Sequence, residues 1–533
     1  MAPSNGETRS WSLLLGVLPW LVLVGFAAMC SAAVQLAPRD AGLYLVMARQ
    51  LAEGHLPYRD FFFSHPLLHL IPASLIFALR PEGWMLATAV PVAAATATGA
   101  LLWSVARRWS PTAGLIAVVL WCTADAVVIV SAEFVGLACG MLLFAAALAA
   151  EAASRWRLAG AMVALCVLTS TLVGLVAISW LAAVLLLDRR RIRDAAAVAA
   201  AVLVVAAAGC WLAFGPAFFD QVYLSPLHRP SGAGGVASRL RTMVLPFLLQ
   251  HPSVWLAALL VCAGAARHGW RTSTDRAALD TGGEGSSPLA SAGVVAPRTA
   301  LAWAIAVGAI LVFLSLFGSV HAYYTVVCMP PLVLLAAAGW VQVGRLAAPS
   351  SSGSTPAPVA SSDAALPPAR AAARPGARVA LIALVSLILL AIGSGWGTWH
   401  RFAMRTAYQQ QLGVRLEAVA AVLDATVVVE ARLFGDSNVA PLLALAMPRN
   451  LWHQLADTNT KRFRADPEAT ATLVAELQLD PPEVVILLER HGVALLPSVA
   501  AFVRAHYPPP FAFDVGPVDH LRIFVRPAAL RRP

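Results

Sequence analysis

Long apolar runs separated by short polar stretches dominate the first 400 residues of this 533-residue chain. A helix that crosses a membrane needs about 20 consecutive residues that are mostly apolar. Eleven segments have or approach that length, and we predict that each of them spans a membrane. These segments are residues 11–34, 84–106, 111–131, 134–152, 158–171, 173–187, 195–215, 244–266, 299–318, 323–343 and 379–399.

Two of the predicted spans, 158–171 and 173–187, are short. They are either two half-spans or one long helix, and one long helix would reverse the side on which every later loop lies. A single helix would place the four arginines of segment 188–194 outside, against the positive-inside rule, so we favour two spans. The first run is longer than the apolar core of a usual signal peptide, and we interpret it as a retained anchor.

Composition supports the same class of protein. Apolar residues make up 59% of the chain, charged residues make up 12%, and the mean hydropathy is +0.73. Soluble proteins carry about 25% charged residues. These values exclude a soluble enzyme, a disordered protein and a nucleic-acid-binding protein with a basic face. The chain is therefore predicted to be a polytopic α-helical membrane protein with no nucleic-acid partner.

The net charge of +10 is distributed unevenly between the predicted loops. With the N-terminus in the cytoplasm and eleven spans, the inside loops hold 17 arginines and the outside segments before residue 400 hold 7. This bias follows the positive-inside rule and predicts a multi-pass protein of the cell inner (plasma) membrane with residues 400–533 outside. The inside loops 271–298 and 349–377 have low complexity, and we predict disordered linkers there.

The residues from 400 to 533 differ from the predicted spans and indicate a small extracytoplasmic α/β domain. Segments 427–434, 483–488 and 521–526 have the pattern of short buried strands. A helix is predicted to begin at Pro467 and to run to Leu479, and 499–505 has a second helical apolar pattern. Segment 435–438 follows the first strand as a ligand loop would, but it lacks a Gly-x-Gly-x-x-Gly pattern, and we favour a helix cap.

The outside segment 35–83 is too long for a simple connector between the first two spans. Its apolar residues Leu43, Val46, Met47 and Leu51 fall on one helical face, which predicts an amphipathic helix lying in the membrane interface. Asp40 precedes this helix at the depth of the lipid headgroups. Such a carboxylate can meet both a lipid-borne and a water-borne substrate, although a helix-flanking charge is the simpler interpretation.

The residues around Asp40 form a pattern that points to chemistry. Asp40 is followed by Tyr44, then by Gly54-His55-Leu56-Pro57-Tyr58-Arg59-Asp60-Phe61-Phe62, and then by His65-Pro66. This pattern resembles the GT-C superfamily of membrane glycosyltransferases, in particular the protein mannosyltransferase-like group with the lipid A aminoarabinose transferases and the RgtA/B/C/D-like enzymes. The later segment His321-Ala322-Tyr323-Tyr324, followed by Met329-Pro330-Pro331-Leu332, resembles a late segment of the same group.

The resemblance implies a GT-C-like fold over residues 1–399 and a glycosyltransferase whose donor is a polyprenyl-phosphate sugar. The acceptor would be a lipid, a glycan or a protein at the outer face of the membrane. In such enzymes the aspartate of the first loop acts on the acceptor, and Asp40 is the matching position. An inverting transfer needs a base for the acceptor's proton, whereas a departing lipid phosphate needs only positive charge or hydrogen bonds.

The chain departs from the family pattern directly after Asp40. Many members carry a second acid there, and this chain has Ala41. Paired carboxylates favour a divalent metal, so we predict no metal and no other cofactor. Glu133, between the third and fourth predicted spans, is the second catalytic candidate, with a simple turn carboxylate as the alternative. Asp125 is a weaker candidate placed one turn deeper.

Several further residues are candidates for substrate binding. The predicted set is Tyr44, Tyr58, Arg59, Asp60, His65, His321 and Tyr324. Arg59 and Asp60 have a structural ion pair as their alternative role, and His65 has a packing role. His321 and Tyr324 stand at the outer start of a span, where a lipid phosphate would lie. Other phosphate candidates, with solvated loop charge as the alternative, are Arg229, Arg239 and Arg241.

A multi-span transporter or lipid flippase is the alternative function, and a membrane scaffold is a third. Transporters usually contain two related halves and bind their substrates near the bilayer midplane. The sequence shows no such halves, and its candidate polar residues gather on one predicted face. An enzyme with an outside active site accounts for this distribution better.

Overall fold

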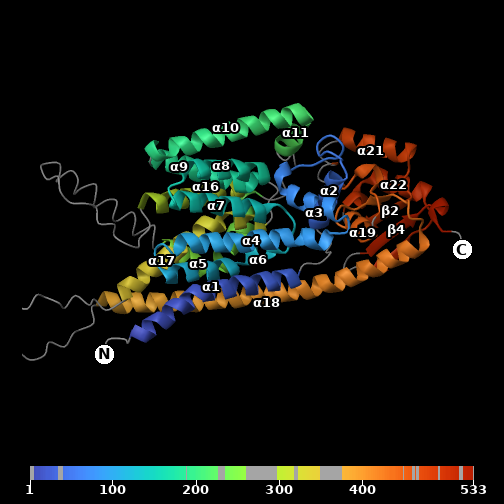
Figure 1. The fold of residues 1–533 in the computed structure, drawn as a ribbon. Coiled ribbons are helices and arrows are strands. Elements are labelled where there is room, and N and C mark those ends of the chain that lie inside the picture. Colours follow the sequence, from blue (N-terminus) through green and yellow to red (C-terminus); the bar gives the residue numbers. More distant parts are fainter. Residues whose placement is uncertain are drawn as a thin grey trace, which may run out of the picture.

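The chain folds into an elongated helical bundle with an α/β domain at one end (Figure 1). The computed structural model describes residues 5–33, 40–187, 189–225, 235–259, 297–316, 322–347, 375–447, 449–458, 463, 467–489, 492–514 and 520–531. The main helices of the bundle are α1 (Asn5–Ala32), α4 (Trp84–Ala106), α5 (Pro111–Cys122), α6 (Asp125–Ser131), α7 (Leu137–Ala152), α8 (Trp156–Thr169), α9 (Thr171–Leu187), α10 (Arg189–Phe214), α16 (Pro297–Leu316), α17 (Met329–Ala347) and α18 (Pro375–Thr426).

The helices confirm a multi-pass membrane protein. Five of the described helices are long and apolar enough to cross a membrane, and two bent helix pairs raise that number to as many as seven. One of these pairs is α5 and α6, which meet at an angle of 65° where the backbone of Ala124 is extended. Because α7, α8 and α9 are shorter apolar helices, the count of eleven spans stays a prediction.

The segment around residue 170 forms two helices, as predicted. Ser170 has an extended backbone between α8 and α9. Gly174 of α9 lies so close to the backbone of Val167 that a Cβ would stand 2.7 Å from the Val167 Cα. The chain therefore turns at Ser170, and the alternative of one long helix is excluded.

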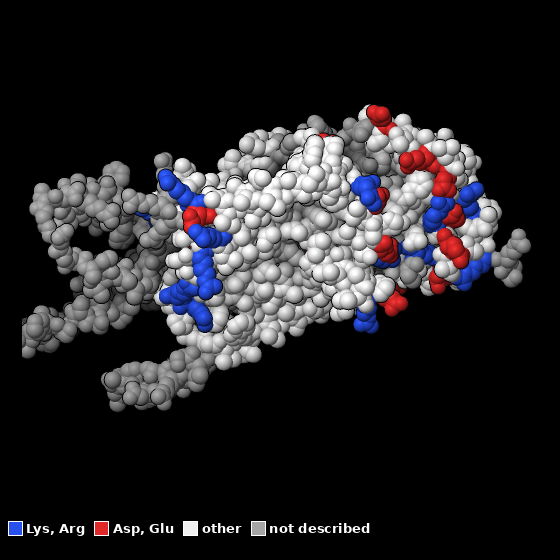
Figure 2. All heavy atoms as spheres, turned by 45° about the horizontal axis from the view of Figure 1, so that its top comes forward, with Lys and Arg blue, Asp and Glu red and all other residues white. Residues whose placement is uncertain are grey.

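A broad belt of the molecular surface carries no charged side chains in the view of Figure 2. Figure 2 shows a band of basic residues at one end of an uncharged surface, and basic and acidic residues mixed at the other end. The loops that follow α4 and α7 carry Arg107, Arg108 and Arg155, and Arg157 lies in the first turn of α8. Arg108 donates to the carbonyl of Ala152. An uncharged belt between two charged ends is the surface that a bilayer requires.

The C-terminal domain contains a four-stranded sheet in the order β1-β2-β4-β3. The strands are β1 (Leu433–Gly435), β2 (Val484–Leu488), β3 (Phe511–Asp514) and β4 (His520–Val525). β1 pairs parallel with β2, and the other two pairs are antiparallel. The domain's helices are α19 (Ala440–Ala446), α21 (Pro467–Leu479) and α22 (Pro497–His506), with short turns η5 (Trp452–Gln454), η6 (Gly492–Leu495) and η7 (Pro527–Ala529).

The predicted elements of this domain are present with altered bounds. β1 is much shorter than 427–434, because Val427 makes only an isolated bridge with Leu530. β3 was not predicted; it is a short strand at the sheet edge with mostly exposed residues, so it lacks an apolar signal. At segment 435–438 the Asp436 carboxylate accepts from the backbone N–H of Asn438 at 2.9 Å, as in a turn that leads into α19.

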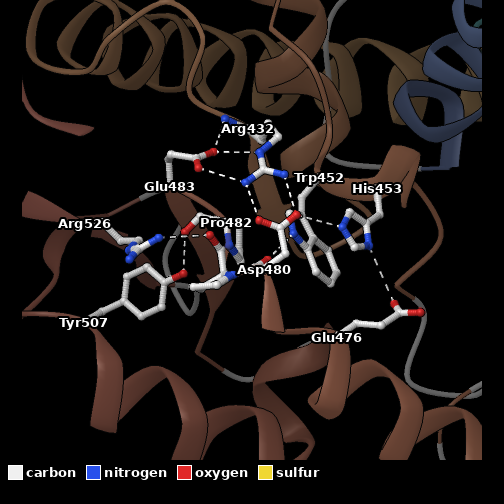
Figure 3. A network of polar contacts seen from close by, with 10 residues as sticks. Arg432, Trp452, His453, Glu476, Asp480, Pro482, Glu483, Tyr507 and Arg526 are labelled. Atoms are coloured by element: carbon white, nitrogen blue, oxygen red, sulfur yellow. Dashed lines mark hydrogen bonds and ion pairs between the residues drawn. The ribbon is translucent and has the colours of Figure 1, made fainter. Parts of the chain in front are cut away.

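A network around Arg432 joins the starts of β1 and β2 (Figure 3). Its guanidinium donates to the Asp480 carboxylate at 2.6 and 2.9 Å and to the Glu483 carboxylate at 2.9 and 3.0 Å. These hydrogen bonds hold the pKa of Asp480 well below its ordinary value, with Arg432 as the largest cause and His453 as a second. Trp452 also donates to the Asp480 carbonyl at 2.7 Å. The network fixes the end of α21 against the parallel strand pair.

α18 connects the bundle to the C-terminal domain without a break. It is 52 residues long, and the domain boundary predicted at residue 400 falls inside it. Leu416, Val419 and Leu423 from its last turns are buried in the core that the domain shares with the first loop. The position of the domain is therefore set by a helix that also packs along the bundle (Figure 1).

The fold predicts that the α7–α8 turn and the β1 loop lie on opposite sides of the membrane. Reporter fusions at Arg155 and at Gly435 are therefore expected to give opposite signals, with Gly435 outside if the arginine bias sets orientation. The same signal from both fusions would contradict the arrangement in Figure 1.

Candidate functional site

The first loop provides the centre of the candidate site. It contains α2 (Asp40–Ala52), η1 (Leu67–His69) and α3 (Ile71–Leu79). The predicted helix is present, but its surroundings differ from the prediction: Gly42–Ala48 and Gln50 are all buried. α2 is not half exposed in a membrane interface, because the C-terminal domain covers the side that the bundle leaves open.

Two polar side chains dock α2 onto the C-terminal domain. Arg49 donates to the carbonyls of Ala444 at 3.1 Å and Arg449 at 2.9 Å, and Gln50 donates to the carbonyl of Gln454 at 3.1 Å. Near the other end of α2, a Cβ on Gly42 would stand 2.4 Å from the Cδ2 of Leu442. A larger residue would have to displace the buried Leu442 side chain, so Gly42 permits the close packing of α2 against α19.

Tyr44 and Tyr58 fix the position of His65. The Tyr44 hydroxyl lies 2.7 Å from His65 Nε2, and the Tyr58 hydroxyl donates to the His65 carbonyl at 2.7 Å. Asp40 is partly buried and stands one helical turn before Tyr44. Residues four apart share a helical face. The structure thus brings three predicted site residues, Tyr44, Tyr58 and His65, into contact, and Asp40 lies one helical turn from Tyr44 on α2.

The segment that contains Tyr58 is held in a strained turn. Tyr58 has a φ of +67°, a conformation that side chains other than glycine rarely adopt. The side chain of Gln221 stabilises it by donating to the Tyr58 carbonyl at 3.1 Å and accepting from the Phe63 N–H at 2.8 Å. Strain maintained by such contacts is common at functional sites.

Arg59 and Asp60 make the contacts expected of a structural pair. Arg59 Nε donates to Asp60 Oδ1 at 2.8 Å, and the N–H of Leu56 donates to Asp60 Oδ2 at 2.7 Å. The Arg59 hydrogen bond, followed by that of Leu56, lowers the pKa of Asp60 to about 2. Asp60 is therefore an ionised carboxylate that closes its own turn, which favours the structural alternative for both residues.

His69 connects the first loop to the turn between α6 and α7. Its ring lies 5.4 Å from that of Tyr44 and 6.2 Å from that of Phe134, measured between centroids. A Cβ on Gly136 would stand 2.8 Å from the His69 ring. Burial lowers the pKa of His69 to about 4, so the imidazole is neutral at physiological pH. His69 was not among the predicted site residues; its spacing of four residues from His65 is the sequence signal for this contact.

Both carboxylates flanking α6 pair with arginines of α18. Glu133, which directly precedes Phe134, is buried and forms an ion pair with Arg405. Asp125 forms an ion pair with Arg401, with 3.1 Å between Nη2 and Oδ1. Sequence reasoning missed both arginines. The sequence feature that could have identified them is their position: they stand four residues apart, directly after the predicted span 379–399.

The segment that begins at Ala322, which belongs to the predicted late motif, lies near α6. Tyr324 is half-buried in η4 (Ala322–Cys328), which packs against α6 and α14 (Leu245–Gln250). His321 and Arg229 lie outside the described residues, as does the side chain of Arg239. Arg241 is exposed in η3 (Leu240–Val244), which follows α13 (Val236–Arg239).

An apolar cavity of about 470 Å³ lies beside the first loop. Residues of α8, α10, α11 (Ala217–Phe219) and η2 (Asp220–Leu224) form its walls. They are Val167, Leu168, Leu203, Ala207, Phe218, Phe219, Tyr223 and Leu224. The Phe218 ring lies 5.1 Å from the Tyr58 ring, so the cavity adjoins the strained turn.

Within the described residues, no group of three or more His, Cys, Asp or Glu side chains is placed to hold a metal ion. The described side chains include the Tyr44–His65 pair one helical turn from Asp40, and two arginines of α18 that pair with Asp125 and Glu133. Such groups can accept a proton and stabilise an anion.

Comparison with solved structures confirms the GT-C-like fold predicted from the first-loop pattern. ArnT from Cupriavidus metallidurans matches in its apo state with a TM-score of 0.60 at 14% identity, over 97% of this chain and 98% of that one. ArnT bound to undecaprenyl phosphate matches with a TM-score of 0.60 at 14% identity, over 98% of this chain and 99% of ArnT. No family model and no curated protein sequence matches the chain.

Two glycines provide a matched test of packing around His69. Gly136 and Gly54 both have positive φ, of +75° and +95°, but only Gly136 has a neighbour within 4 Å of the Cβ position. Gly54→Ala is expected to cost about 1–2 kcal/mol of backbone strain. Gly136→Ala should cost more, because the methyl group must displace His69. Thermal unfolding of the purified proteins measures both, and equal losses would contradict the close packing at His69.

Proposed function

We propose that this chain is an inverting glycosyltransferase. It would move a sugar, a hexose or a pentose, from a polyprenyl-phosphate donor to a lipid, glycan or protein acceptor. The reaction would take place at the outer face of the inner membrane, with the N-terminus in the cytoplasm. The proposal is supported above all by one observation: Tyr44, one helical turn after Asp40 on α2, lies 2.7 Å from His65 Nε2 in a loop that shares its core with the C-terminal domain.

The comparison with ArnT supports the choice of donor. The fold is shared over almost the full length of both chains, and one of the matching structures contains undecaprenyl phosphate. The apolar cavity beside Tyr58 offers a surface for part of an isoprenoid chain. A lipid bound there would have its phosphate end near the first loop.

In the proposed reaction Asp40 accepts the proton of the acceptor hydroxyl. The acceptor oxygen forms a bond to the anomeric carbon while the bond from that carbon to the phosphate oxygen breaks. Polyprenyl phosphate departs with the electron pair, and the configuration at the anomeric carbon inverts. Tyr44, His65, Tyr324 and His321 would bind substrates, and Tyr58 and the Arg59–Asp60 pair would hold the loop that presents them.

Glu133 takes a secondary role in this proposal. Its carboxylate is buried and forms an ion pair with Arg405. A carboxylate engaged in this way is better suited to orient a substrate than to accept a proton. The clustering of these groups beneath an outer domain also favours an enzyme over a transporter, whose site would lie near the midplane.

The role of Asp40 is tested by Asp40→Asn. Asparagine has nearly the same volume, so folding and insertion should be retained, but it cannot accept the proton. Transfer is expected to fall about 10²–10⁴-fold, the usual contribution of a positioned base. Initial rates at matched protein levels measure the change. Glu133→Gln is the comparison and should lose less. A nearly normal rate for Asp40→Asn would refute the assignment.

Metal dependence provides a separate test. Because Ala41 stands where related sequences carry a second acid, transfer is expected to continue in the presence of EDTA. Assaying membranes with and without the chelator measures this. Loss of transfer that a divalent ion restores would contradict the prediction.

A further inference from the structure

Two consecutive residues of the C-terminal domain have backbone conformations that are rare outside glycine. His453 has a φ of +47° and Gln454 has a φ of +55°. A residue with a Cβ is strained in this region, and it stays there only where surrounding contacts maintain it. Both residues belong to η5, the turn that the side chain of Gln50 in α2 contacts. The strain therefore lies where the domain meets the helix that begins at Asp40.

Contacts with α21 hold His453 in this conformation (Figure 3). Nε2 of His453 lies 3.0 Å from Asp480 Oδ2, and its Nδ1 lies 3.8 Å from Glu476 Oε2. The imidazole also stacks on the Trp452 ring, with 4.1 Å between the centroids and 11° between the planes. Asp480 is itself fixed by Arg432. The strained turn is thus maintained by the same network that joins the starts of β1 and β2.

Gln454 presents two hydrogen-bond acceptors to α2. The side-chain amide of Gln50 donates to the Gln454 carbonyl at 3.1 Å and to Gln454 Oε1 at 2.8 Å. Gln50 is 1% exposed, so the loss of an acceptor would leave a buried donor unsatisfied, which is unfavourable. Relaxing Gln454 to a negative φ would redirect the chain and move both acceptors. The contact with α2 therefore depends on the strained conformation.

A glycine at position 454 would adopt the same backbone without strain. Glycine has no Cβ and populates positive φ readily, as Gly54 and Gly492 do in this chain. A glycine would keep the carbonyl acceptor for Gln50, but it would lose Oε1. The side-chain acceptor is therefore what the strained glutamine adds to the contact with α2.

We infer that Gln454 is a positioning residue for the proposed reaction. Its two hydrogen bonds to Gln50 fix the rotation of α2 about its axis, and Asp40 is the first residue of the same helix. Gln454 acts on the reaction only through Gln50 and α2. The inference rests on the proposed function and adds a residue of the C-terminal domain to the groups that determine the rate of transfer.

Gln454→Gly separates a positioning role from a structural one, because it removes the strain and Oε1 together. Relief of strain offsets the lost hydrogen bond, so the melting temperature should change by less than about 4 °C. The kcat of transfer should nevertheless fall about 10-fold, because small displacements of a reacting group are costly. The KM for the donor should stay the same. Rates are measured with the labelled polyprenyl-phosphate sugar that the unaltered chain transfers.

Amide hydrogen exchange gives a second measurement that needs no substrate. The His55 N–H donates to the Gln50 carbonyl at 2.9 Å, so its exchange rate reports opening at the end of α2. Gln454→Gly should speed this exchange about fivefold, the value of a neutral hydrogen bond. Gln50→Leu removes both hydrogen bonds from the other side. The double variant should therefore lose no more kcat than Gln50→Leu alone.

Ser154→Gly is the matched control. Ser154 also has a positive φ, of +58°, and is exposed in the turn between α7 and α8. Its replacement by glycine relieves the same kind of strain without touching the contact between η5 and α2. The kcat of transfer and the exchange rate at His55 should equal those of the unaltered chain.

Unchanged kcat or unchanged exchange at His55 in Gln454→Gly overturns the inference and leaves the proposed function intact. A larger fall in melting temperature that accompanies the loss of kcat would identify a merely structural residue and would also overturn it. Additive losses in the double variant would show that Gln454 does not act through Gln50. If the unaltered chain transfers no sugar from any donor, the proposed function and the inference both fail.

Discussion

Burial of α2 between the bundle and the C-terminal domain determines where every residue of the candidate site lies. Eight of its 13 residues are buried, so the helix has little freedom to move or rotate without exposing apolar surface. Arg49 and Gln50 fix its far end by hydrogen bonds to carbonyls of the domain. Asp40 and Tyr44 at the near end are then held in a defined orientation, as catalysis by a positioned base requires.

The C-terminal domain maintains this arrangement because α18 anchors it. The helix runs from Pro375 in the bundle to Thr426 in the domain. The two ion pairs from Arg401 and Arg405 join α18 to α6 between these ends. Glu133 is buried, so removing Arg405 would leave an uncompensated charge, which is unfavourable. The same contacts that position the domain therefore place two positive charges beside α6.

Much of the fold follows from apolar patterning. The bounds of α4 agree with the predicted span 84–106, and the turn at Ser170 separates two helices as the arginine bias required. The bend between α5 and α6 was not predicted, because Thr123 and Asp125 interrupt the apolar run without a glycine or proline to mark a break at Ala124. β3 was missed because a short, exposed edge strand has no apolar period.

The candidate site was predictable only where residues lie close in sequence. Asp40, Tyr44, Tyr58 and His65 belong to one loop, and their pattern indicated a shared role. Arg401 and Arg405 meet Asp125 and Glu133 from more than 270 positions away, and no local pattern encodes such a pairing. The burial that makes His69 neutral is likewise a property of packing against Phe134 and Gly136.

The central claim is that the chain transfers a sugar from a polyprenyl phosphate at the outer membrane face. The most direct measurement incubates membranes containing the chain with polyprenyl phosphates that carry different labelled sugars, and follows the label. We expect one labelled sugar to move to an acceptor and an equal amount of polyprenyl phosphate to be released. If no sugar moves, or if the intact donor crosses the membrane without cleavage, the chain is not the transferase described, and intact crossing would instead indicate a flippase.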